Sequence, residues 1–183
     1  MSDYSGLTAE EIGLLPSEGD VKLYAERGWY LSEKLLTDEE TELLTQASER
    51  FYAGQRDREL PVRPDRLADW TPADGEIQRN NDYIHYQDET IAKILRKPII
   101  GAVAARLAKA AEIRVFQATL IYKPPIEDEA SNIVSWHFDK FFWPTCSSDN
   151  MLTAFIPFHD CTEEAGTIEM VNGSHLWPKR HGA

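Results

Sequence analysis

The sequence lacks the features of disulfide-stabilised, membrane-spanning and secreted proteins. Its two cysteines, Cys146 and Cys161, are too few for a disulfide framework and lack the Cys-x-x-Cys spacing of a zinc knuckle. No apolar run reaches the roughly 18 residues that a transmembrane helix requires. The N-terminus also lacks the basic-then-apolar order of a signal peptide. We therefore expect a cytoplasmic protein with no membrane partner, whose cysteines are reduced packing residues.

Basic residues are scarce relative to acidic ones. The 183 residues include 19 Lys and Arg against 31 Asp and Glu, which gives a formal net charge of −12 at pH 7. Nucleic acids and anionic membranes bind to basic protein surfaces. The charge therefore disfavours both as partners. It leaves room for a small anionic ligand held by a single Lys or Arg.

Helical signals fill much of the first 110 residues, within what we expect to be one domain over residues 1–183. Short helices are expected at 9–15 and 21–27. Thr37 begins a capping box, followed by apolar residues at helical spacing. Residues 88–109 are again helical, and Pro98 either kinks this helix or begins a second one.

The composition of the remaining segments predicts one long loop and four strands. Residues 54–75 hold three prolines and many charges, which predicts a long loop, either a binding lid or a disordered segment. After residue 111, four segments are rich in β-branched and aromatic residues and are separated by turn-rich stretches. They are residues 115–122, 133–138, 151–158 and 167–171. Helices first and strands later predict an α+β protein whose strands form a sandwich or barrel.

One short motif at the end of the second of these segments points to chemistry. His137 and Asp139 are two residues apart, and side chains with that spacing on a strand point the same way. An imidazole and a carboxylate so placed supply two of the three ligands in the facial triad of non-haem Fe(II) oxygenases. An isolated His-x-Asp is also common as a surface pair, so the surrounding sequence decides between the two interpretations.

The surrounding sequence resembles the phytanoyl-CoA dioxygenase family of Fe(II)- and 2-oxoglutarate-dependent oxygenases, from Gly28 to about Trp177. The resemblance rests on several pieces in the family's order and spacing. They are Gly-Trp-Tyr-Leu at 28–31, the capped helix from Thr37, Leu-Ile-Tyr-Lys-Pro-Pro at 120–125, Trp-His-Phe-Asp at 136–139, residues 152–158, Glu-Ala-Gly-Thr at 164–167 and Asn-Gly-Ser-His at 172–175.

The resemblance implies a fold and a set of site residues. The fold is a double-stranded β-helix, a cupin-like jelly roll, with flanking N-terminal helices. His137 and Asp139 would bind Fe(II), with 2-oxoglutarate as co-substrate. Thr119 and Phe155 would line the co-substrate pocket, and Gln117, which shares the strand face of Thr119, is a weaker candidate. The alternative for Thr119 and Phe155 is ordinary barrel core.

The family pattern continues beyond what the sequence shows. The resemblance implies a second iron-binding His, and a basic residue that anchors 2-oxoglutarate, on later strands. It makes the His of Gly-Ser-His, here His175, a turn residue. We therefore expect a domain that lacks its C-terminal strands and its third ligand. The alternative is a shortened homologue that uses His175 or His181.

These observations predict an Fe(II)- and 2-oxoglutarate-dependent dioxygenase. It would use O₂ to hydroxylate an unactivated C–H bond of a small organic substrate. A halogenase is disfavoured because such sites lack the carboxylate that Asp139 supplies. A non-catalytic jelly-roll binding module and an inactive truncated homologue are the alternatives. The identity of the substrate and the oligomeric state do not follow from the sequence.

Overall fold

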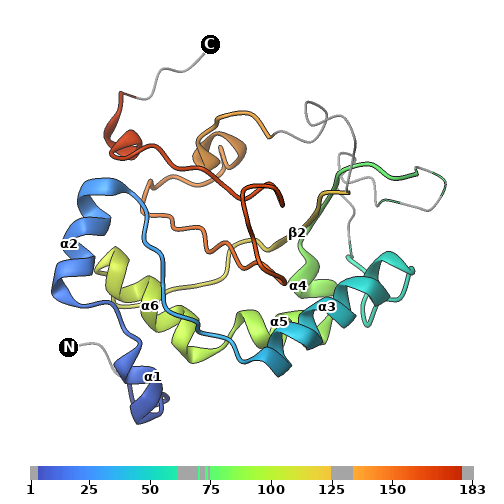
Figure 1. The fold of residues 1–183 in the computed structure, drawn as a ribbon, viewed down its shortest axis with the longest axis horizontal. Coiled ribbons are helices and arrows are strands. Elements are labelled where there is room, and N and C mark those ends of the chain that lie inside the picture. Colours follow the sequence, from blue (N-terminus) through green and yellow to red (C-terminus); the bar gives the residue numbers. More distant parts are fainter. Residues whose placement is uncertain (1–3, 62–69, 71–72, 74, 125–133, 179–183) are drawn as a thin grey trace.

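A computed structural model describes residues 4–61, 70, 73, 75–124 and 134–178, and shows helices, a small sheet and long connecting segments (Figure 1). The elements are α1 (Ala9–Gly13), α2 (Glu18–Arg27), α3 (Asp38–Tyr52), β1 (Arg79–Asp82), α4 (Ile84–Gln87), α5 (Glu89–Leu95), α6 (Pro98–Ala108) and β2 (Thr119–Tyr122). Two 3-10 turns follow, Asp139–Phe142 and Ser174–Leu176. None of the described helices is long and apolar enough to cross a membrane.

The predicted helices form, and local sequence signals set their boundaries. Helices α1, α2 and α3 each begin with a capping box, in which the N-cap side chain and the residue three positions on satisfy each other's backbone N–H groups. Gly28 ends α2 in the left-handed conformation that glycine adopts at low cost. Pro98 occupies the first turn of α6, where it lacks only a donor that would be unpaired in any case. It therefore begins a second helix rather than kinking one.

The buried apolar residues that the structure describes form two clusters. The first joins α3, α4, α5 and β2 through buried residues that include Phe51, Ile84 and Leu120. The second joins α2 and α6 around Val21 and Ile99. Helices α2, α3, α5 and α6 thus each place an apolar stripe against their neighbours, as the helical spacing predicted, whereas α1 has no buried residue.

In the part of the chain that the structure describes, the sheet has two antiparallel strands, and its first strand was not predicted from the sequence. In β1, Arg79 lies opposite Tyr122 of β2. The Arg79 guanidinium lies 3.5 Å from the ring centroid of Trp70, 4.2 Å from that of Tyr122 and 4.8 Å from that of Tyr52. Cation–π contacts with desolvated rings stabilise a buried guanidinium. They let a strand as polar as Arg-Asn-Asn-Asp pack against the helices.

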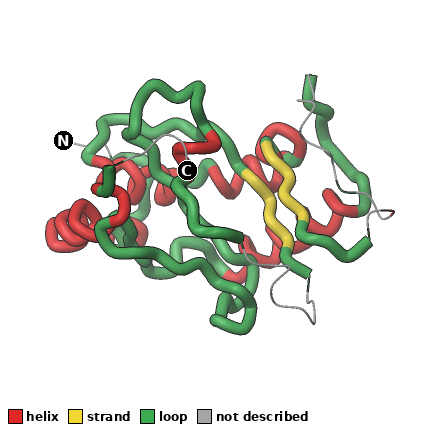
Figure 2. Tube along the Cα trace, turned by 90° about the horizontal axis from the view of Figure 1, so that it is seen from above, coloured by secondary structure: helices red, strands yellow, loops and turns green. Residues whose placement is uncertain are grey.

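The jelly roll is not confirmed. Of the four predicted strands, only residues 119–122 form one. The described residues 115–118, 134–138, 151–158 and 167–171 are irregular, so the strand prediction is wrong for them. Figure 2 shows the short strand pair beside long loops. A strand requires a partner backbone for its ladder of hydrogen bonds, and β-branched composition alone does not supply one.

Three other predictions concern loops, cysteines and domains. Much of the predicted loop 54–75 lies outside the described residues. Cys146 and Cys161 are both free thiols and partly buried, which agrees with reduced packing residues. The prediction of a single domain over residues 1–183 stays a prediction.

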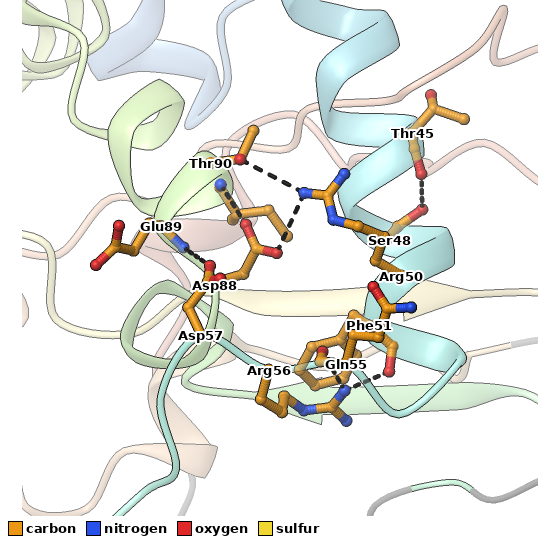
Figure 3. Close-up of polar contacts among 11 residues, drawn as sticks. Thr45, Ser48, Arg50, Phe51, Gln55, Arg56, Asp57, Asp88, Glu89 and Thr90 are labelled. Atoms are coloured by element: carbon orange, nitrogen blue, oxygen red, sulfur yellow. Dashed lines mark hydrogen bonds and ion pairs between the residues drawn. The ribbon is translucent and has the colours of Figure 1, made fainter.

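A network of polar contacts joins α3 to the start of α5 (Figure 3). Asp88 caps α5 by accepting a 2.8 Å hydrogen bond from the Ile91 N–H, and its other oxygen lies 3.7 Å from Arg50 Nη2 of α3. Asp57 accepts a 2.8 Å hydrogen bond from the Glu89 N–H one residue further on. The start of α5 is therefore held by its own cap, Asp88, and by Asp57 from a different segment.

The segment at 172–175 docks on the end of α2. Trp29 Nε1 donates to Asn172 Oδ1 at 2.7 Å, and the Gly173 N–H donates to the Arg27 carbonyl at 2.8 Å. His175 Nε2 lies 3.1 Å from the Ala25 carbonyl oxygen. The Gly-Trp and Asn-Gly-Ser-His motifs, about 145 positions apart, are thus two halves of one contact.

We predict that Gly28→Ala destabilises the fold through two separable effects. Gly28 has φ of +86°, and a Cβ there would overlap the His175 ring, lying 2.9 Å from its Cγ. The left-handed conformation alone should cost roughly 1–2 kcal/mol. The overlap should add about 1–3 kcal/mol, as overpacking does. Urea unfolding of the parent and the variant measures the resulting loss of unfolding free energy.

Gly54→Ala is the matched control, because Gly54 also has φ of +86° but a Cβ there would have no neighbour within 4 Å. The double variant Gly28→Ala, His175→Ala should recover much of the overlap cost relative to His175→Ala alone. Equal losses of unfolding free energy in the two glycine variants would contradict the docking of His175 on α2.

Candidate metal centre

His137 and Asp139 come together at the start of a 3-10 turn. Asp139 is the first residue of that turn, and His137 lies two residues before it in an irregular segment. His137 Nε2 is 3.3 Å from Asp139 Oδ1. The predicted strand is therefore wrong here, while the expected convergence of the two side chains is confirmed.

A backbone carbonyl determines which nitrogen of His137 faces the carboxylate. His137 Nδ1 lies 2.7 Å from the Ser135 carbonyl oxygen, which can only accept, so Nδ1 carries the proton and donates. In the neutral ring Nε2 then has a free lone pair directed at Asp139. Metal-binding histidines are commonly held in this way, with the second nitrogen donating to a carbonyl or carboxylate.

Asp139 is oriented by a side chain from a different segment. Thr153 Oγ1 donates a 2.5 Å hydrogen bond to Asp139 Oδ2, a distance typical of charge-assisted O–H···O⁻ bonds. The remaining oxygen, Oδ1, is the one that faces His137. Both ligand candidates are therefore fixed by contacts outside the pair itself.

The separation of the two atoms fits a shared metal ion. Two lone pairs 3.3 Å apart repel each other unless a proton or a cation lies between them. Cis ligands on metal–ligand bonds of roughly 2.1 Å would be about 3 Å apart. The two side chains are 37% and 43% exposed, so an ion can reach them. His137 and Asp139 could thus hold two positions on a metal.

The described residues supply no third protein ligand. Among them, no group of three or more His, Cys, Asp or Glu side chains is placed to hold a metal ion. His175 forms part of a 3-10 turn and docks on α2, in agreement with the expectation that it is a turn residue. His181 lies outside the described residues.

The residues expected to line the co-substrate pocket are partly brought together. Gln117 Nε2 donates to Thr119 Oγ1 at 3.3 Å, and Thr119 Oγ1 donates to Asp82 Oδ1 at 2.5 Å. Asp82 lies opposite Thr119 across the strand pair. Sequence reasoning missed Asp82, because nothing in the polar sequence of β1 signals a strand. Phe155 lies in an irregular segment and is 47% exposed.

Gln117, Thr119 and Asp82 form a polar row. Ring and core contacts connect this polar row to the segments that hold Asp139 and Thr153. Phe116, next to Gln117, packs edge-on against Trp143, with ring centroids 5.9 Å apart. Trp143 directly follows the 3-10 turn that begins at Asp139. Phe158, from the segment that holds Thr153, packs on the cluster containing Leu120.

A histidine and a carboxylate converging at 3.3 Å, each held by a further contact, define a candidate site for a single metal ion. The sequence profile of the family described as phytanoyl-CoA dioxygenase (PhyH) matches residues 24–183. The chain therefore belongs to the phytanoyl-CoA dioxygenase family, whose members are dioxygenases that generally depend on Fe(II) and 2-oxoglutarate. Comparisons with curated proteins and with solved structures found no match.

We predict that Thr153→Val weakens metal binding while leaving the fold intact. The substitution removes the hydroxyl that orients the Asp139 carboxylate and keeps the side-chain volume. Loss of such an outer contact typically lowers metal affinity roughly 10–100-fold. Titration with Co²⁺, followed by its visible absorption, gives the dissociation constant. Thr145→Val, at an exposed position, is the control, and equal affinities in the two variants would contradict the role of Thr153.

Proposed function

We propose that this protein is an Fe(II)- and 2-oxoglutarate-dependent dioxygenase that hydroxylates an unactivated C–H bond of a small organic substrate. The main support is the pairing of His137 Nε2 and Asp139 Oδ1 at 3.3 Å in a chain of this family. The two atoms match the imidazole and carboxylate legs of a facial triad. The carboxylate leg also distinguishes the site from that of a halogenase.

In this proposal His137 and Asp139 hold the iron. When bound, Fe(II) would supply the site at which O₂ and 2-oxoglutarate react to oxidise the substrate. The protein's own contribution is to keep the ligands in position. The Ser135 carbonyl keeps the imidazole proton on Nδ1, and the Thr153 hydroxyl keeps one oxygen of Asp139 facing the ring.

Gln117, Thr119 and Phe155 are proposed to line the co-substrate pocket. Because the Thr119 hydroxyl donates to Asp82, it has no second proton to offer a carboxylate. The Gln117 amide, which has two N–H groups and uses one on Thr119, keeps one donor free for a ligand. Gln117 is therefore better placed than Thr119 to donate a hydrogen bond to the co-substrate in this arrangement.

A non-catalytic binding module is the second candidate, and one observation favours it. The described residues bring together two metal ligands rather than three. A two-ligand site would bind Fe(II) weakly and would not position the co-substrate. Measurement of metal binding and of turnover separates the two candidates.

We predict that His137→Ala abolishes both iron binding and 2-oxoglutarate decarboxylation, because it removes the only imidazole that faces a carboxylate among the described residues. Iron content per chain and succinate release are the measurements. His159→Ala is the control, since the His159 ring instead contacts the neighbouring Asp160 carbonyl. Iron content in His137→Ala equal to that of the parent would overturn the assignment.

We predict that Asp139→Gly leaves the fold intact but stops hydroxylation. Asp139 is partly exposed, and its side-chain contacts are with His137 and Thr153 rather than with the core. The variant would lose the charged ligand, and chloride could take its place. Circular dichroism checks the fold and product analysis checks the reaction. Hydroxylation at the parent's rate would show that Asp139 is not a ligand.

A further inference from the structure

A second candidate site lies in a pocket of about 350 Å³, formed by α4, the junction of α5 and α6, and residues 113–115. No residue beyond Val115 lines it, so it shares no residue with the candidate metal centre. Its walls combine a polar part, at His85, Arg96 and Arg114, with an apolar part. The apolar part consists of Leu95, Ile113 and Val115.

The charge of the pocket is opposite to that of the chain. Its lining includes Arg96, Lys97 and Arg114 and no acidic residue, although the chain has a net charge of −12. Lys97 pairs with Glu40 at 2.8 Å, and Arg114 with Glu112 at 2.8 Å. Arg96 is exposed and pairs with no carboxylate among the described residues, so its charge is available to a ligand.

The pocket also lies at the start of an 11-residue helix. Lys97, Pro98 and Gly101, from the N-cap and first turn of α6, line it. The N-cap residue makes no side-chain hydrogen bond to the helix. Pro98 has no N–H, and the Ile100 and Gly101 N–H groups donate to the Lys97 carbonyl, which leaves the Ile99 N–H as the first-turn donor that a ligand could use. Such a group, together with the helix dipole, favours an anion.

His85 provides an independent sign that a ligand belongs here. Its side chain is 3% exposed, and neither ring nitrogen has a hydrogen-bond partner among the described residues. A buried polar atom left without a hydrogen-bond partner destabilises the fold. Burial, and then the charge of Arg96, lower the pKa of His85, so the ring is neutral at neutral pH. Its ring packs on Tyr86, with centroids 4.1 Å apart.

We propose that this pocket binds a phosphate group, either as free phosphate or as the head of a small monoester with an apolar body. Arg96 and the N-terminus of α6 supply the positive potential, and a small shift of the His85 ring would give its N–H an acceptor. Leu95, Ile113 and Val115 would contact the apolar body. The site is independent of the proposed oxygenase reaction.

The test is an NMR titration of the ¹⁵N-labelled protein at constant ionic strength and without metal, with inorganic phosphate, phenyl phosphate and acetate as probes. We expect saturable shifts of the Ile99 and Gly101 amides and of the His85 ring with the two phosphates, and weaker binding of acetate. Tighter binding of phenyl phosphate would identify a monoester site, and equal or weaker binding a site for free phosphate.

Two variants check the residues. Arg96→Gln should weaken phosphate binding about tenfold or more, the loss expected for one charge-assisted hydrogen bond. Lys93→Gln is the matched control, because it removes the same charge from an exposed position of α5 outside the pocket. His85→Gln should weaken binding without changing the far-ultraviolet circular dichroism.

Three results would overturn the proposal. One is the absence of a saturable shift with both phosphates, and another is acetate binding as tightly as phosphate. The third is equal phosphate affinity in Arg96→Gln and Lys93→Gln. Because no metal is present, these outcomes do not depend on whether the protein is an oxygenase.

Discussion

The buried carboxylate of Asp88 is the constraint on which the packing of α3, α4 and α5 depends. It is 5% exposed, caps α5 and faces Arg50 of α3. An uncompensated charge at this depth would be costly, so the cap and the arginine must both be present. They fix α4 and α5 against α3. The Ile84 N–H of α4 then donates to the Ala118 carbonyl at 3.2 Å, which positions the start of β2. The helices thus hold the polar row of Gln117, Thr119 and Asp82 in place.

The helices were predictable because their signals are local. A capping box, an apolar stripe and a proline at a first turn each act within a few residues, so Thr37 and Pro98 could be interpreted from the sequence alone. The strands were predictable only at residues 119–122, because a strand depends on a partner that is distant in sequence. Residues 151–158 have strand composition but no ladder partner among the described residues. Residues 79–82 have none of that composition, yet pair with β2 because aromatic rings surround Arg79.

The candidate site was predictable to the extent that its residues lie close together in sequence. A spacing of two was enough to bring His137 and Asp139 into contact, although the local backbone is a 3-10 turn rather than a strand. Gln117 and Thr119 were likewise brought together by short spacing. Thr153 was missed because its contact with Asp139 spans 14 positions. A contact across a fold leaves no periodic trace in the sequence.

The surroundings of the described histidines explain why only one is a convincing metal ligand. The His85 ring is buried without a hydrogen-bond partner among the described residues, and the His159 ring contacts the carbonyl of the next residue. His175 directs Nε2 at a carbonyl of α2, where it serves docking. His137 alone among these has one nitrogen committed to a carbonyl and the other facing a carboxylate. A facial-triad site needs a deprotonated imidazole nitrogen beside an anionic oxygen, and that arrangement, rather than the number of histidines, makes His137 and Asp139 the candidate ligands.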